Sequence, residues 1–254
     1  MANPTLNQSI FQKLRTESYS ESMTIKGTMA KSLLLLVIIM LAGGYTWKMF
    51  YGAANPNATM PYLWGGLIVG FILAMIIIFK PKTAPYLSPI YAAAEGLSLG
   101  VVSAIYNFSI NPEGTSSQMG IVLPAVAITL TCAFLMFILY NTRIIKVNNK
   151  FRKIIYLALI SILVFYAGTA IASLFGANVS LLVGNSPLSI GISVVICAVA
   201  AFSLLTDYDM IEQGAMYGAP KYMEWYGAFA LMVTLVWLYL EILKLLAKIS
   251  ARER

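Results

Sequence analysis

The sequence predicts an all-α membrane protein, folded as a bundle of seven transmembrane helices. Hydrophobic residues make up 59% of the 254-residue chain, and charged residues make up only 11%. The mean hydropathy is +0.79, and soluble domains carry roughly 25% charged residues, so this composition favours a lipid environment. Seven apolar runs are each long enough for the ~20-residue helix that crosses a bilayer core.

Short breaks that contain proline, glycine, asparagine or charge separate the seven runs. The first run begins after Lys26, and the second, fourth, fifth and sixth contain no charged residue. The third is interrupted only by Glu95, and the seventh only by Glu241 and Lys244. A re-entrant element in place of one weaker run is the alternative. We predict spans at 29–50, 60–79, 84–108, 119–140, 154–176, 187–206 and 225–246.

The chain before the first run is polar and does not resemble a cleaved signal peptide, so residues 1–27 are predicted to form a cytoplasmic polar tail. No long linker, low-complexity tract or repeat divides the rest of the chain. We therefore expect residues 28–254 to form a single seven-helix transmembrane domain.

Basic residues alternate between the connections. Segments 51–59, 110–118 and 177–186 contain no lysine or arginine, whereas the connections around 80–82 and 143–153 are basic. The positive-inside rule then predicts a cytoplasmic N-terminus and, with seven spans, a C-terminus outside. The basic residues after position 243 oppose this orientation, and the alternative is a last run that does not fully cross.

Composition also argues against several functions. The formal net charge of +7 lies mainly in short connections, so it indicates membrane orientation and no nucleic-acid partner. Cys132 and Cys197 lie inside apolar runs and histidine is absent, which argues against a disulfide framework and transition-metal chemistry. No zinc-protease, GxSxG or phosphate-loop motif is present, so we expect neither an enzyme nor a cofactor.

Four carboxylates lie within or at the edge of the apolar runs, where each ionised group costs several kcal/mol. Asp207 and Asp209 end the sixth run, and their spacing of two residues puts them on different helix faces. Glu241 either faces the bundle interior or pairs locally with Lys244 at i+3. These acids are the candidate ion or proton sites.

Glu95 lies near the middle of the third run, beside small residues that leave room for a neighbouring helix. It is either protonated or paired across the bundle, where it could share a proton with another carboxylate. Arg143 follows the fourth run and is either an orientation anchor or a counter-ion to an aspartate on the same side. Glu95, Asp207 and Arg143 are thus supporting candidates along an ion path.

Residues 204–248 resemble the C-terminal signature of the Bax inhibitor family, the transmembrane Bax inhibitor motif proteins, and particularly a bacterial branch. Tyr208-Asp209 matches a tyrosine-aspartate pair of the sixth helix, and 238–242 (LYLEI) matches a Leu-Tyr-Leu-Asp-Ile motif of the seventh. The resemblance implies a bundle with a central C-terminal helix in the bacterial cytoplasmic (inner) membrane. It also implies a pH-sensitive calcium leak governed by two acids that share a proton, which would be Asp209 and Glu241.

Two departures from the family pattern affect this pair. The second acid is Glu241 instead of aspartate, and the interval from Asp209 to Glu241 is longer by about two helical turns. A tight turn at 218–220 would leave the two acids at different levels. The pair can form if 221–227 is irregular; if 221–227 is not irregular, Glu241 faces Glu95 instead.

The predicted function is therefore a calcium or cation leak channel gated by protonation of buried carboxylates. Its expected partners are the lipid bilayer and calcium or protons. The alternatives are a non-transporting regulator that binds a membrane protease or another membrane protein, and a proton-coupled transporter.

Overall fold

A computed structural model describes residues 22–53, 55–110, 120–175, 184 and 186–252. Within these residues, seven helices are long and apolar enough to cross a membrane, which confirms the predicted all-α seven-helix class. Two short 3-10 helices, η1 (Pro56–Thr59) and η2 (Pro81–Thr83), precede the second and third of them. The seven are α2 (Ile25–Gly52), α3 (Met60–Phe79), α4 (Ala84–Ile110), α5 (Val122–Asn141), α6 (Asn149–Leu174), α8 (Pro187–Met216) and α9 (Met223–Arg252).

Helix ends differ from the predicted spans where polar residues continue or cap a helix. The largest difference is at α8, which extends to Met216, because its polar last third remains helical beyond the predicted end at 206. α2 begins at Ile25, since the Thr24 side chain accepts a hydrogen bond from the Gly27 amide. Residues 1–21 of the predicted tail lie outside the described residues.

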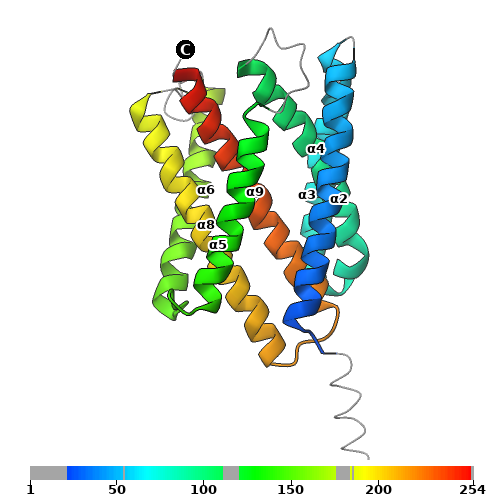
Figure 1. Ribbon diagram of the computed structural model, residues 1–254, viewed down its shortest axis with the longest axis vertical. Helices are drawn as coiled ribbons and strands as arrows, with labels where there is room; N and C mark the ends of the chain where they lie inside the picture. The colour runs from blue at the N-terminus through cyan, green and yellow to red at the C-terminus, as the bar shows by residue number, and fades with distance from the viewer. Residues whose placement is uncertain (1–21, 54, 111–119, 176–183, 185, 253–254) are drawn as a thin grey trace, which may run out of the picture.

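The last helix, α9, is central. It packs against α2, α4, α5 and α8, and it runs obliquely behind the gap between α5 and α2 in Figure 1. Large apolar side chains on several of its faces are buried, among them Met232, Leu238 and Leu243. The predicted central C-terminal helix is confirmed. In contrast, α6 lies at the periphery of the bundle, because Ile155 is the one buried residue that it contributes among the described residues.

Glycines allow α2 and α4 to pack closely. A Cβ at Gly96 would lie 2.6 Å from the Ile39 carbonyl oxygen, and one at Gly100 would lie 2.1 Å from Thr46 Oγ1. Thr46 in turn donates to the Leu97 carbonyl oxygen at 3.0 Å. The backbones therefore approach through small residues and a hydrogen bond, as membrane helices commonly do.

The two ends of the bundle differ in charge. We call one end the basic end; it carries the start of α2, the connections at 80–83 and 142–148, and the α8–α9 turn at 217–222. Gly218 in that turn has φ +66°, a conformation that favours glycine. The chain leaves the bundle at the opposite end, where α9 finishes at Arg252 (Figure 1).

Candidate functional site

Asp209 is the most highly connected predicted acid at the basic end. This residue of α8 is 8% exposed, and its Oδ2 pairs with the Arg152 guanidinium of α6. Gln213, one turn along α8, donates to the same oxygen at 3.0 Å, and the Tyr140 hydroxyl of α5 donates to Oδ1 at 3.4 Å. The carboxylate therefore joins three helices.

Glu212 continues this network toward solvent. It accepts hydrogen bonds from the Tyr140 hydroxyl and from Arg143, which adopts a left-handed backbone conformation with φ 57° just after α5. The hydrogen bond to Glu212 raises the pKa of the Arg143 guanidinium above its usual value. We call Tyr140, Arg143, Arg152, Asp209, Glu212 and Gln213 the basic-end cluster.

Asp207 lies two residues away but in a different environment. Its Oδ2 is fully buried and has no hydrogen-bond partner in the described part of the chain, and the side chain lies near Thr234 of α9. A buried carboxylate without a hydrogen-bonded cation is costly to keep ionised. Asp207 is therefore the acid on α8 whose charge is least compensated.

Glu241 lies farther along α9 and is 1% exposed. Lys244 pairs with it at 2.9 Å, the Tyr166 hydroxyl of α6 donates to it at 3.0 Å, and Trp237 Nε1 donates at 3.2 Å. The Lys244 ammonium also lies 5.1 Å from the centre of the Tyr166 ring. The i+3 pair with Lys244 that the spacing predicted is thus present, together with an inward-facing carboxylate. We call Tyr166, Trp237, Glu241 and Lys244 the Glu241 cluster.

One turn beyond that cluster, Lys248 is 8% exposed, an unusual location for a lysine. Its ammonium donates to the hydroxyls of Ser189 at 2.9 Å and Ser193 at 2.8 Å, both on α8. Its third contact is to the Ser189 carbonyl oxygen at 3.5 Å, and together these bonds fasten the end of α9 to the start of α8.

The structure does not bring Asp209 and Glu241 together. Asp209 lies seven residues before the end of α8 and Glu241 eighteen residues after the start of α9, which separates their levels by about 17 Å along the axes. α9 is already helical at Met223, so 221–227 does not form the irregular segment that a pair would require. Within the described residues the two acids have separate partners.

Glu95 faces a third direction. Its Oε2 lies 2.8 Å from the position that a Cβ on Gly70 would occupy, so the carboxyl lies against α3. The alternative in which Glu241 faces Glu95 is therefore not what the structure contains. Arg143 is a counter-ion, in line with one of its two predicted roles, but to Glu212 instead of an aspartate.

Sequence reasoning missed an ion-pair group that fastens α2 to α9. Glu224 is fully buried and accepts hydrogen bonds from the Thr24 amide at 2.9 Å, from the Thr24 hydroxyl at 2.8 Å, and from Lys31. Lys221 adds a contact at 3.1 Å. A Cβ on Gly27 would lie 2.3 Å from this carboxylate, so only glycine leaves room for it.

No group of three or more histidine, cysteine or acidic side chains that could hold a metal ion occurs among the described residues. The acids instead provide carboxyl oxygens at different heights in the bundle, with Asp207 and Asp209 on α8 and Glu241 on α9. Such groups can exchange protons, accept a passing cation, or hold helices together by ion pairs that break when a partner is neutralised.

Comparison with known proteins gives a family match. A family model described as Bax inhibitor 1 like matches residues 3–251, nearly the whole chain. No curated protein and no solved structure is significantly similar to the sequence.

Proposed function

Because the chain belongs to the Bax inhibitor 1-like family, we propose that it is a pH-sensitive calcium leak channel of the bacterial cytoplasmic membrane. The observation that carries the proposal is the contrast between two carboxyls on α8: Asp207, whose Oδ2 is buried without a hydrogen-bond partner among the described residues, and Asp209, which pairs with Arg152. One can respond to protons, and the other holds helices in place.

Asp207 is the proposed proton-responsive group. Calcium prefers carboxylate and carbonyl oxygens, and a proton competes with it for the same carboxylate. A buried carboxyl without a hydrogen-bonded cation changes its charge state more readily than one with a cation beside it. Acidification at the basic end should therefore neutralise Asp207 and reduce the leak.

Asp209 is the proposed clamp. Its bond to Arg152 is a main polar contact between α6 and α8, and α6 contributes little apolar burial of its own. Breaking this ion pair should loosen α6 from the bundle and increase the leak. Glu241 supplies a further carboxylate level on α9, nearer the opposite end.

We propose that the basic end faces the cytoplasm. Its connections carry Lys80, Lys82 and Arg143, and Arg152 lies in the first turn of α6, in agreement with the positive-inside rule. The start of α2 then lies on the cytoplasmic side and the end of α9 outside. Calcium is the transported ion in this proposal, and no resident cofactor or enzymatic reaction is involved.

Calcium entry into liposomes that contain the purified protein and a calcium-sensitive dye tests the proposal. We expect the wild-type leak to fall as the basic end is acidified. Asp207→Asn should lower the leak about tenfold and remove its pH dependence, whereas Asp209→Asn should increase it. Glu95→Gln, a carboxyl-to-amide change on the far side of α4, is the matched control and should match wild type.

Two outcomes would favour the alternatives. A wild-type protein without flux, and with no effect of neutral replacements, would favour a regulator of another membrane protein. Accumulation of a solute that collapses with the proton gradient would favour a proton-coupled transporter.

A further inference from the structure

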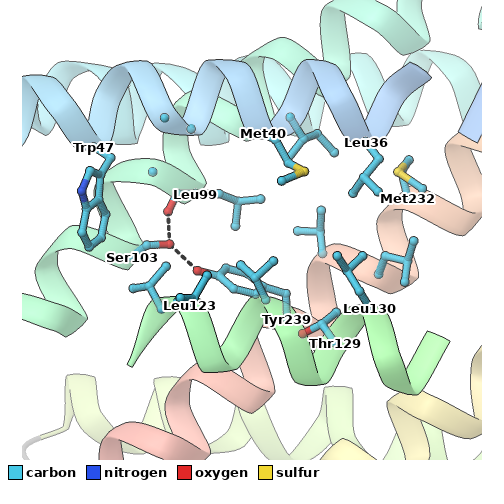
Figure 2. Close-up of a pocket in the computed structure, with 18 residues that line it drawn as sticks. Leu36, Met40, Trp47, Leu99, Ser103, Leu123, Thr129, Leu130, Met232 and Tyr239 are labelled. Carbon is cyan, nitrogen blue, oxygen red and sulfur yellow. Dashed lines mark hydrogen bonds between the residues drawn. The ribbon is translucent and has the colours of Figure 1, made fainter. Parts of the chain in front are cut away.

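A hydrophobic groove lies along the part of α9 that carries Met232, Leu235, Val236 and Tyr239. It has a volume of about 240 Å³, and α2, α4, α5 and α9 all contribute to its walls. Figure 2 shows Leu36 and Met40 on one side and Leu123 and Leu130 on the other, with Met232 beside Leu36 at one end. Its lining is almost entirely apolar.

The groove is continuous with the lipid-facing surface. Met40 of α2 is 54% exposed and Leu123 of α5 is 61% exposed, so both walls reach the outside of the bundle. Gly44, also in the lining, has no heavy atom within 4 Å of the position where a Cβ would be. Since seven helices span the membrane, what lies outside this opening is hydrocarbon and not water.

The length of the groove matches one leaflet. Leu36 and Trp47 mark its extent along α2, and eleven residue steps along the helix span about 17 Å. Half of a bilayer core of about 30 Å is about 15 Å. The groove thus runs from near the outer end of α2, at Trp47, to the middle of the bundle, at Leu36.

The polar atoms on the groove floor are already paired. Ser103 Oγ lies 2.6 Å from the Tyr239 hydroxyl and 2.6 Å from the Leu99 carbonyl oxygen, as the dashed lines in Figure 2 mark. A cavity of about 150 Å³ with apolar walls stays dry and takes up apolar ligands such as benzene, so a larger apolar groove that opens to lipid should also fill with hydrocarbon.

We propose that this groove binds one acyl chain of a phospholipid from the leaflet at the opposite end of the bundle. The length and the apolar lining suit a single hydrocarbon chain, and an empty groove would forfeit dispersion contacts along α9. The bound lipid would form part of the packing of the central helix. This site is separate from the carboxylates and does not rest on the proposed calcium leak.

Photolabelling tests the proposal directly. The full-length protein is reconstituted into phosphatidylethanolamine–phosphatidylglycerol vesicles with a trace of phosphatidylglycerol that carries a diazirine midway along one acyl chain. After irradiation, we expect groove residues such as Met40 and Leu130 to be labelled at least about fivefold more than exposed residues of α3 such as Ile68 and Phe71. Equal labelling of both surfaces would overturn the proposal.

A pair of glycine variants sharpens the test. Gly44→Phe places a ring in the groove and should reduce groove labelling about fivefold without changing that of α3. Gly65→Phe on α3 is the matched control, since a Cβ there also meets nothing within 4 Å, and should leave groove labelling unchanged. If wild type forms a dimer that Gly44→Phe dissociates, the occupant is a second copy of the chain and the lipid proposal fails. The wild-type labelling ratio decides the matter even if a variant misfolds.

Discussion

The basic-end cluster and the Glu241 cluster both attach α6 to the bundle, but they do so differently. Asp209 takes its cation, Arg152, from α6 itself, whereas Glu241 takes its cation, Lys244, from three residues along its own helix. At Glu241 the link to α6 is the hydroxyl of Tyr166. Neutralising the first acid therefore removes a charge contact between helices, and neutralising the second removes mainly a contact within one helix.

Among the variants that test this difference, Arg152→Met should have the largest effect on stability and on the calcium leak. It leaves Asp209, 8% exposed, without its cation, and removal of one partner from a buried pair costs about 3 kcal/mol. We expect destabilisation of that order in unfolding measurements in detergent, and an increased calcium leak. A double variant with Asp209→Asn should recover part of the stability; no recovery would mean that the two side chains do not act as a pair.

Asp207→Asn should change the calcium leak and its pH dependence while leaving the stability of the bundle nearly unchanged. The amide has nearly the same shape, so stability should change by less than about 1 kcal/mol or increase, because a buried group that is costly to ionise is removed. The leak should be low and no longer respond to pH between mildly acidic and neutral conditions. A retained pH response would assign proton sensing to another group.

Lys244→Met should have a smaller effect than Arg152→Met. Glu241 keeps its hydrogen bonds from Tyr166 and Trp237, and these partly compensate for the lost cation, so we expect a cost of about 1–2 kcal/mol. The calcium leak should stay near the wild-type value. An increase as large as that of Arg152→Met would show that both clusters control α6 equally.

Glu212→Gln should have the smallest effect. Its partner Arg143 is more than half exposed, and exposed ion pairs contribute little to stability because water and salt screen them. Stability and leak should therefore remain close to wild type, and the small difference should shrink further at high salt. A large salt-independent loss would show that Glu212, rather than Asp209, carries the contact with α5.

The sequence predicted the framework better than the contacts. Apolar runs and alternating basic connections predict seven spans, since lipid constrains both features directly. The helical extension of α8 to Met216 was not predicted, because its acids appear in the sequence as a helix that emerges into water. Their counter-ions come from elsewhere in the chain.

Arg152 illustrates why those counter-ions could not be identified from the sequence. It is 57 residues from Asp209, and the sequence places it in the predicted basic connection 143–153, where positive charge is explained by membrane orientation alone. The Asp209–Glu241 pair failed for a geometric reason. Two helices of 30 residues joined by a tight turn keep these acids about 17 Å apart in level. The resemblance to the family singled out Asp209 and Glu241, but the lengths of α8 and α9 determine which residues lie beside them.

The contact between Gly27 and Glu224 fastens the first membrane helix to the start of the last one. The bundle is thereby closed at one end into a ring, in which the two terminal helices brace each other. Neither of these two helices can be lost without breaking the contact: removal of α2 would strip Glu224 of its donors, and removal of α9 would leave Lys31 without its carboxylate. The protein should therefore tolerate cleavage of a connection between helices better than the loss of α2 or α9.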